Sequence, residues 1–197
     1  MVKVVVINGR PGCGKTTFEH LCEDICGTFT IEPNGNGLGF SKNKTLYVDI
    51  CSTVGFVKHI AKECGWDGTK TLENRRFLSD LKDLLTRWND IPFKRIKARA
   101  DFRAKSDGIV DWILFVDCRE PAEIQKLKER LNAITVLIRR ESVENSDVSN
   151  HADADVFYYD YDLTIENNSD IIELAKKAKD FIEYMKKEEV PHYVDVD

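Results

Sequence analysis

The stretch VKVVVINGRPGCGKTTFEHLC, residues 2–22, combines an apolar run, a turn with three glycines, and the polar start of a helix. Residues 2–7 are apolar apart from Lys3, which is typical of a buried central strand in a parallel sheet. Residues 15–26 then predict a helix that Gly27 ends. A strand that passes through a tight turn directly into a helix predicts the first unit of an α/β fold.

The turn itself, GRPGCGKT at 9–16, matches the pattern GxxxxGK[ST] between a predicted strand and a predicted helix. Glycines in this turn let successive backbone N–H groups point inward and form an anion-binding nest, to which the helix N-terminus adds positive charge. Lys15 can reach the β- and γ-phosphates of a nucleoside triphosphate, and the Thr16 hydroxyl can ligate Mg²⁺. The alternative is a glycine-rich turn that only connects two elements. The predicted ATP-binding residues are Gly9, Gly12, Cys13, Gly14, Lys15, Thr16 and Thr17.

The remainder of the chain alternates strands with helices. Further strands are predicted at 45–51, at 109–116 and at 133–138, with a last one within 156–165; helices are predicted at 52–64, 71–89, 92–105, 121–132 and 169–187. This order predicts a parallel sheet with helices on both faces. The helix at 71–89 has apolar residues at helical spacing, so we expect it to bury one face. Residues 33–44 are read as a loop or a hairpin, and the tail at 188–197 as frayed.

Asp117 ends the apolar run WILFVD, a pattern that indicates a second Mg²⁺-associated carboxylate beside a phosphate-binding turn. Its alternative role is to cap the helix that begins near Pro121. Arg119 follows in the loop at the carboxyl end of the strand, where ligands of open α/β sheets bind, although a solvated arginine is an equal alternative.

Composition excludes several classes of protein. A net charge of −5 argues against general affinity for nucleic acid or anionic membranes, and no apolar stretch is long enough to span a bilayer. The N-terminal residues predict a strand instead of a signal peptide, so we expect a cytoplasmic protein whose six cysteines are thiols. Cys22 and Cys26 share a helical face, where burial is favoured over metal binding. The sequence indicates no protein partner and leaves a homodimer open.

Three segments resemble the deoxynucleoside monophosphate kinase family of adenylate kinase-like P-loop kinases. They are VGFVKHIAKECGWDGTKTLENRRFLSDL at 54–81, DCREPAEIQKLKE at 117–129 and DYDLTIENNSDIIEL at 160–174. The resemblance implies a three-layer P-loop NTPase sandwich forming one kinase domain over 1–197. It further implies an inserted monophosphate-binding helical segment at about 52–106 and a short lid at about 140–155.

The resemblance also implies an activity and its residues. The γ-phosphate of ATP would pass to a nucleoside or deoxynucleoside monophosphate with Mg²⁺ as cofactor, so the partners are small-molecule nucleotides. Lys58, Arg75 and Arg119 would face the acceptor phosphate. Arg139 and Arg140 would flank the lid, Arg139 as a catalytic residue and Arg140 on the ATP side. Lys15 and Asp117 would complete the catalytic set, and Thr16 and Asp117 would hold the metal.

Two departures leave alternatives open. The lid segment has no arginine after Arg140, whereas Arg95, Arg99 and Arg103 share one face of the helix at 92–105, where they could close over phosphates or remain solvated. A hydroxyl kinase of the same fold, acting on a sugar, a shikimate-like acid or dephospho-coenzyme A, would need a base, and Asp49 is the candidate. A third hypothesis is an ATP-binding regulator without kinase activity.

Overall fold

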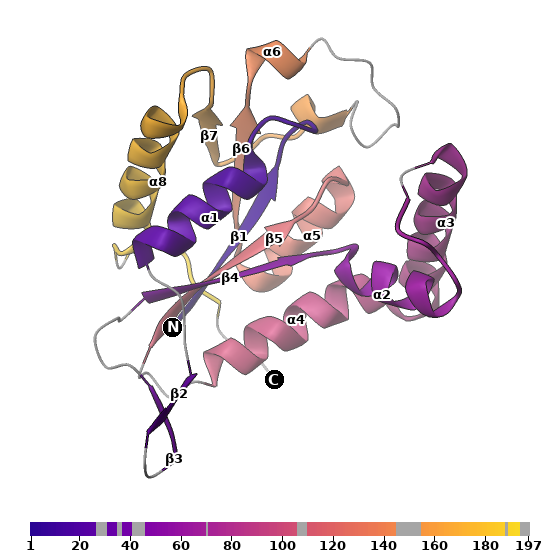
Figure 1. Cartoon of the computed structure of the whole chain (residues 1–197), viewed down its shortest axis with the longest axis horizontal. Coiled ribbons are helices and arrows are strands. Elements are labelled where there is room, and N and C mark those ends of the chain that lie inside the picture. The colour runs from indigo at the N-terminus through magenta and orange to yellow at the C-terminus, as the bar shows by residue number, and fades with distance from the viewer. Residues whose placement is uncertain are drawn as a thin grey trace.

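A five-stranded parallel sheet forms the centre of the molecule (Figure 1). The computed structural model describes residues 1–26, 31–34, 37–40, 46–69, 71–105, 110–144, 155–187 and 189–193. Across the sheet the strands are β4 (Leu46–Ser52), β5 (Asp111–Asp117), β1 (Val2–Asn8), β6 (Ile134–Arg139) and β7 (Leu163–Glu166). Because all five are parallel, their carboxyl ends meet at one edge, and the turn after β1 leaves the middle of that edge.

Helices cover both faces of this sheet (Figure 1). One face packs against α1 (Lys15–Cys26) and α8 (Ile171–Met185), and the other against α4 (Ile91–Ala104) and α5 (Pro121–Leu131). The predicted fold class, an α/β sandwich of three layers, is confirmed. Its two apolar cores explain why β1 is apolar on both faces apart from Lys3, since alternate residues of a strand point to opposite faces.

The core on the α1 side is built on aromatic contacts. Phe18 of α1 makes edge contacts with Phe115 of β5 and Phe181 of α8, with ring centroids 6.4 Å and 5.5 Å apart. Lys3 is the exception within β1: its buried ammonium donates hydrogen bonds to the carbonyls of Met185 and Lys187, at 2.5 Å and 2.6 Å. A charged side chain is tolerated there because the end of α8 supplies carbonyl acceptors.

Two further helices extend to the side of the sheet (Figure 1). They are α2 (Gly55–Glu63) and α3 (Leu72–Asn89), which pack on each other and on α4. The prediction of a helix near 71–89 is confirmed, but its apolar face is only partly buried: Leu78, Leu81 and Leu85 are half-buried. Leu72, Leu84 and Trp88 are 61%, 54% and 75% exposed. Helical spacing predicts where apolar residues gather, but burial also needs an element that covers them.

Of the two alternatives for residues 33–44, loop or hairpin, the structure favours the second: β2 (Ile31–Asn34) pairs antiparallel with β3 (Gly37–Phe40). Other local predictions change. The last strand is confined to β7, with a short 3₁₀ turn, η1 (Asp155–Phe157), before it. The helix predicted from residue 52 begins later, at Gly55: Ser52 ends β4, and its hydroxyl accepts a hydrogen bond from the N–H of Val54 at 3.1 Å.

The two ends of the described chain also differ from expectation. The predicted lid begins with α6 (Glu141–Glu144), while residues 145–154 lie outside the described residues. The tail predicted to be frayed is partly packed, because Val190 and Tyr193 are buried. The N–H of Tyr193 also donates to the carbonyl of Val2 at 2.7 Å. No described helix has the length and apolar character that crossing a membrane requires.

Candidate phosphate-binding site

The turn between β1 and α1 has a backbone that only glycine accommodates at two positions. Gly9 and Gly14 have φ angles of +147° and +101°. A Cβ on Gly9 would lie 2.3 Å from the carbonyl oxygen of Ile138, and one on Gly14 would lie 2.4 Å from Nδ2 of Asn167. The turn is therefore pressed against the end of β6 and against the residue that follows β7, which fixes its curvature.

Asn167 anchors this turn, and the sequence analysis did not single it out. Its buried side chain donates from Nδ2 to the carbonyl of Cys13 at 2.8 Å, and its own N–H donates to the carbonyl of Arg139 at 2.7 Å. This bond satisfies the buried Cys13 carbonyl and ties the turn to the end of β7. The only sequence signal for this role is its place directly after the last strand.

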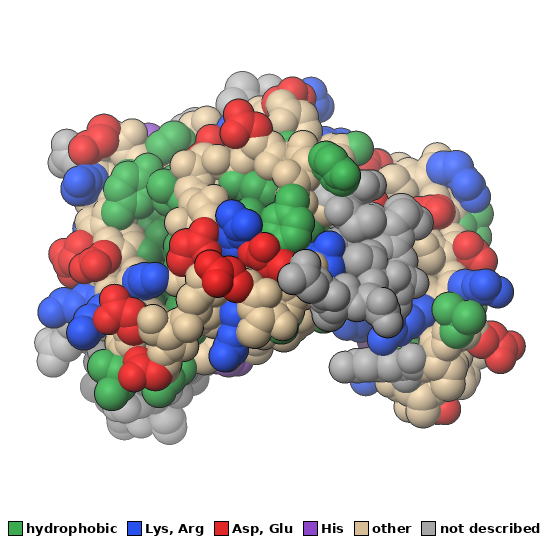
Figure 2. All heavy atoms as spheres, turned by 90° about the horizontal axis from the view of Figure 1, so that it is seen from above, with side chains coloured by type: hydrophobic (Ala, Val, Ile, Leu, Met, Phe, Trp, Pro, Cys, Tyr) green, Lys and Arg blue, Asp and Glu red, His purple; other side chains and the backbone are tan. Residues whose placement is uncertain are grey.

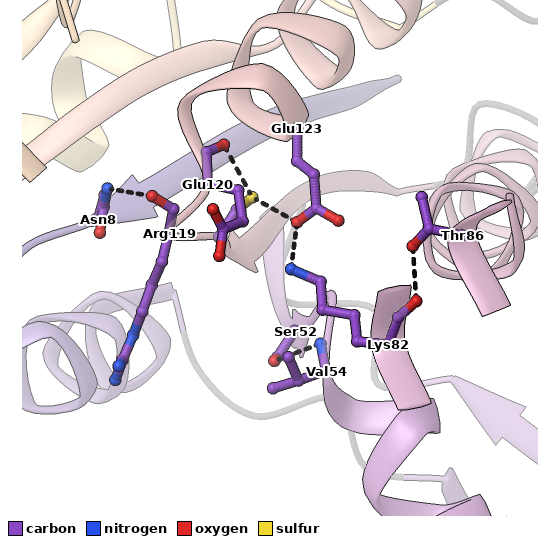
Figure 3. Close-up of polar contacts among 9 residues, drawn as sticks. Asn8, Ser52, Val54, Lys82, Thr86, Arg119, Glu120 and Glu123 are labelled. Atoms are coloured by element: carbon purple, nitrogen blue, oxygen red, sulfur yellow. Dashed lines mark hydrogen bonds and ion pairs between the residues drawn. The ribbon is translucent and has the colours of Figure 1, made fainter. Parts of the chain in front are cut away.

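Asn8, the last residue of β1, is hydrogen-bonded to the first residue of the turn. Its buried side chain accepts a hydrogen bond from the N–H of Gly9 at 2.8 Å and donates to the Tyr161 hydroxyl at 2.7 Å. A longer bond of 3.4 Å reaches the carbonyl of Arg119 (Figure 3). Tyr161, expected on a strand, instead lies before β7, and burial raises its pKa to about 12. Asn8 thus joins the turn to the loop that carries Arg119.

Lys15 begins α1 and lies across the turn. Its ammonium donates to the carbonyl of Gly9 at 2.5 Å and to that of Arg10 at 3.1 Å. Thr16 and Thr17 follow with exposed side chains. Cys13 is buried 3.9 Å from the ammonium, and its burial raises the pKa of the thiol although Lys15 opposes this. The helix start, the ammonium and the turn together form a positive end suited to phosphate.

Asp117 ends β5 at the same edge of the sheet, where it pairs in register with Ile7 of β1 and with Ser52 of β4. Burial raises the pKa of its carboxyl group, and the positive charges of Lys15, Arg119 and Lys58 oppose that rise. Three predicted site cations therefore act on Asp117. Arg75, exposed in α3, is not among the groups that act on it.

Figure 3 shows the start of α5, just after the loop that follows β5, bonded to α3. Arg119 extends from this loop, and Glu123 in the first turn of α5 accepts a hydrogen bond from the ammonium of Lys82 at 2.6 Å. The Cys118 thiol lies 3.5 Å from the same Glu123 oxygen. Lys82 and Glu123 were not predicted as site residues, since nothing in either helix alone indicates that they meet.

Glu19, one turn along α1 from Lys15, is a further acidic group that sequence reasoning missed. The residue is 1% exposed, and its Oε1 has no hydrogen-bond partner among the described residues. Burial raises its pKa to about 8; the negative charge of Asp117 adds to the rise, and Lys15 opposes it. A glutamate on a helix face gives no sequence signal of this kind, because its burial depends on the sheet below it.

The predicted lid arginines lie at the end of β6. Arg139 is exposed and bonds to Glu144 of α6, with Nε 2.5 Å from Oε1, and its Nη1 lies 3.9 Å from Glu166 of β7. Its guanidinium also lies over the ring of Phe157, 5.7 Å from the centroid. Arg140, which follows it, is half-buried. Carboxylates on both sides thus hold Arg139 beside the turn.

Asp49 does not fit the role of a catalytic base. It lies inside β4, opposite Leu114 in the register, and not at the strand's carboxyl end. It accepts hydrogen bonds from Nε of Arg99 and of Arg103, both at 2.8 Å. Burial favours a higher pKa for Asp49, but these bonds outweigh it and lower the pKa below its usual value. A base that is ionised and doubly bonded in this way is a poor proton acceptor.

The bonds to Asp49 also show where the arginines on one face of α4 are directed. Arg99 and Arg103 are directed at Asp49, and Arg103 also stacks on Trp112 at 4.0 Å from the ring centroid. Arg95 lies over Phe56, 3.9 Å from its centroid. The arginine face therefore packs onto β4 and α2, and it neither stays wholly solvated nor closes over the phosphate site.

The residues at the turn suit Mg²⁺ held together with phosphates. Within the described ranges, no group of three or more His, Cys, Asp and Glu side chains could hold a metal by itself. Mg²⁺ commonly binds through one or two carboxylates, substrate phosphates and several waters, and so does not need such a cage. Thr16 and Asp117 supply a hydroxyl and a carboxylate, and the orphan Glu19 oxygen supplies a buried acceptor for a donor such as a metal-bound water.

Charge on this face of the molecule is mixed. Figure 2 views the molecule from the side of α6, onto the carboxyl ends of the strands, and shows basic and acidic side chains interspersed. The net charge of the chain is −5, so both signs are present on a mildly acidic protein.

Comparison with known proteins gives likeness only at the level of solved structures. No protein-family model and no curated protein matches the chain. A sugar kinase from Janibacter sp. HTCC2649 aligns with a TM-score of 0.45 and 15% identity, over 93% of this chain and 95% of that one. Shikimate kinase from Bacteroides thetaiotaomicron aligns with a TM-score of 0.41 and 12% identity, over 92% and 98% of the two chains.

Proposed function

We propose that this protein is an ATP-dependent kinase that phosphorylates a nucleoside monophosphate or deoxynucleoside monophosphate. The observation that carries the proposal is that three cations act electrostatically on Asp117, at the edge of the sheet where the phosphate-binding turn lies. Lys15 belongs to the turn, whereas Lys58 and Arg119 come from α2 and from the loop after β5. Transfer between two phosphates gathers several negative charges, and cations from both sides offset them.

The roles of the residues follow from their positions. The N–H groups of the turn and the start of α1 would hold the terminal phosphates of ATP, and the Lys15 ammonium would exchange its bonds to Gly9 and Arg10 for phosphate oxygens. Lys58 and Arg119 would hold the acceptor phosphate in line with the donor. Mg²⁺, when bound by Thr16 and Asp117, would neutralise charge on the β- and γ-phosphates.

A phosphate acceptor is preferred over a hydroxyl acceptor for a chemical reason. A phosphate oxygen is already anionic and needs no base, whereas a hydroxyl group benefits from a carboxylate that removes its proton. Asp49, the candidate base, is bonded to Arg99 and Arg103. This arrangement supports the monophosphate acceptor.

The test is a coupled assay of ADP formation with ATP and Mg²⁺ against three sets of acceptors: the common nucleoside and deoxynucleoside monophosphates, shikimate and sugars, and water alone. We expect turnover that depends on one or more monophosphates. Turnover with a sugar or with shikimate alone would instead indicate a hydroxyl kinase, and tight ATP binding without any acceptor-dependent turnover would indicate a regulator. Lys62→Ala, an exposed lysine one turn along α2 from Lys58, serves as the matched control for Lys58→Ala.

A further inference from the structure

Glu19 is a buried acidic side chain whose surroundings leave one of its oxygen atoms without a donor. The residue is 1% exposed, and the unpartnered atom is Oε1. An ionised carboxylate can only accept hydrogen bonds, so ionising this buried group without a donor costs free energy, and burial raises its pKa to about 8. A native buried group of this kind calls for a partner that the described chain does not supply.

The position of Glu19 indicates what that partner is. Glu19 follows Thr16 by three residues and Lys15 by four, so all three lie on one side of α1. Its charge and that of Asp117 act on each other, and both act on the Cys51 thiol at the end of β4. Glu19 and Asp117 therefore lie within electrostatic range of each other, one on α1 and the other at the carboxyl end of β5.

None of the described side chains donates a hydrogen bond to Oε1 of Glu19. The Lys15 ammonium is directed at the carbonyls of Gly9 and Arg10. Asp117 is itself an acceptor when it is ionised. Because Glu19 is almost fully buried, direct coordination of an ion is less suitable than contact through water. Mg²⁺ keeps several waters when proteins bind it, and each water is a hydrogen-bond donor.

We propose that Glu19 is a positioning residue of the magnesium site: its carboxylate accepts a hydrogen bond from a water of the hydrated Mg²⁺ that Thr16 and Asp117 hold together with the nucleotide. Partners of this indirect kind commonly affect metal affinity as much as they affect activity. The proposal rests on the nucleotide and Mg²⁺ part of the proposed function and is independent of the acceptor.

The test measures metal binding directly, with Mn²⁺ as a paramagnetic probe for Mg²⁺. The full chain, saturated with the β,γ-imido analogue of ATP, is titrated with Mn²⁺ and free Mn²⁺ is followed by electron paramagnetic resonance. We expect Glu19→Gln to weaken Mn²⁺ binding by at least about tenfold. Affinity for the ATP analogue in EDTA should stay within about threefold of wild type, because the phosphate contacts of the turn remain. Glu23→Gln, one turn further along α1, is the matched control and should bind Mn²⁺ as wild type does.

Each other outcome is decisive. Wild-type Mn²⁺ affinity in Glu19→Gln would overturn the proposal. A loss of folding stability in Glu19→Gln, measured by urea unfolding without nucleotide, would also overturn it, because it would make Glu19 a structural acceptor. Failure of the wild-type chain to bind Mn²⁺ with the nucleotide would overturn both this inference and the proposed function. The expected Mn²⁺ affinities together with no phosphorylation of any monophosphate would overturn the proposed acceptor. The role of Glu19 at the magnesium site would then still stand.

Discussion

Lys82 of α3 and Glu123 of α5 form an ion pair of 2.6 Å between side chains that are only 11% and 20% exposed. Glu123 begins the helix that follows the Arg119 loop, whereas Lys82 lies on the helix that carries Arg75. The pair therefore holds α3, which carries Arg75, against the start of α5 and the preceding loop, which carries Arg119. Both arginines are predicted to bind the acceptor. A second pair, Lys126 with Asp90, joins α5 to the corner between α3 and α4.

Removing one partner of this pair should destabilise the protein. Lys82→Met leaves Glu123 largely buried without its cation, and we expect the free energy of unfolding to fall by roughly 2–4 kcal/mol. Urea unfolding measures this, with Lys186→Met, in an exposed i,i+3 pair with Glu183, as the control at about 0.5 kcal/mol or less. The double variant Lys82→Met/Glu123→Leu should recover part of the loss, and equal losses in the single and double variants would contradict a coupled pair.

Asp49 should contribute stability that disappears in acid. Its folded-state pKa lies below the usual value because hydrogen bonds from Arg99 and Arg103 outweigh burial, so the unfolded chain binds its proton first as the pH falls. The contribution is complete above about pH 4 and is lost as the pH drops through the folded-state pKa. Asp49→Asn should therefore be less stable than wild type at pH 7, by roughly 2 kcal/mol, and the difference should shrink below about pH 4.

The same variant also separates two chemical roles. If Asp49 is structural, Asp49→Asn that is fully folded should keep kcat within about threefold of wild type. A catalytic base would cost about 10²–10⁴-fold in kcat when removed. A loss of that size in folded protein would restore the hydroxyl-kinase hypothesis.

Lys15 should be essential for catalysis and dispensable for folding. Its bonds to the carbonyls of Gly9 and Arg10 are half-buried, so Lys15→Ala should change the free energy of unfolding by about 1 kcal/mol or less. Loss of the cation at the β- and γ-phosphates should lower kcat by roughly 10³-fold. Near-normal turnover by this variant in the ADP assay would contradict the assignment of the turn.

Arg75 should act on the acceptor and not on ATP. It is exposed in α3, the helix that Lys82 joins to α5 next to the Arg119 loop. Arg75→Ala should lower kcat/KM for the monophosphate by roughly 10²-fold, because a charge-assisted bond to phosphate is lost, with the KM for ATP almost unchanged. Arg87→Ala, in the last turn of the same helix, is the control and should leave both constants as they are. Equal effects of the two variants would mean that only the overall charge of α3 matters.

The bond between Asn167 and Cys13 should determine how well the turn binds nucleotide. Asn167→Leu leaves the Cys13 carbonyl buried without a donor, so we expect a loss of roughly 1–3 kcal/mol in stability. Affinity for ATP, measured by calorimetry, should fall by about tenfold or more because the turn loses its fixed curvature. Gly14→Ala should have a similar effect, since its Cβ would lie 2.4 Å from the Asn167 amide. Normal ATP binding by both variants would refute this anchor.

Local patterns in the sequence were enough to predict β1, the turn, α1 and the acid at the end of β5. Each of these depends on neighbouring residues: an apolar run, a glycine spacing, or the residue type at a strand end. Asn8, Glu19 and Asn167 could not be found in this way, because a buried polar residue is recognised only by partners far along the chain. The exposed face of α3 and the pairing of Asp49 with α4 were missed for the same reason, since both depend on how helices are placed around the sheet.

The hydrogen bond from Asn167 to Cys13 has a consequence for the order in which the protein is made. The two residues are 154 positions apart, so the phosphate-binding motif leaves the ribosome near the start of synthesis and receives its anchor near the end. A nascent chain that stops after β6 contains every residue of the motif but lacks the side chain that orients the Cys13 carbonyl. The nucleotide affinity of nascent chains on stalled ribosomes should therefore rise late, once β7 and Asn167 have emerged. This affinity can report when the fold is complete.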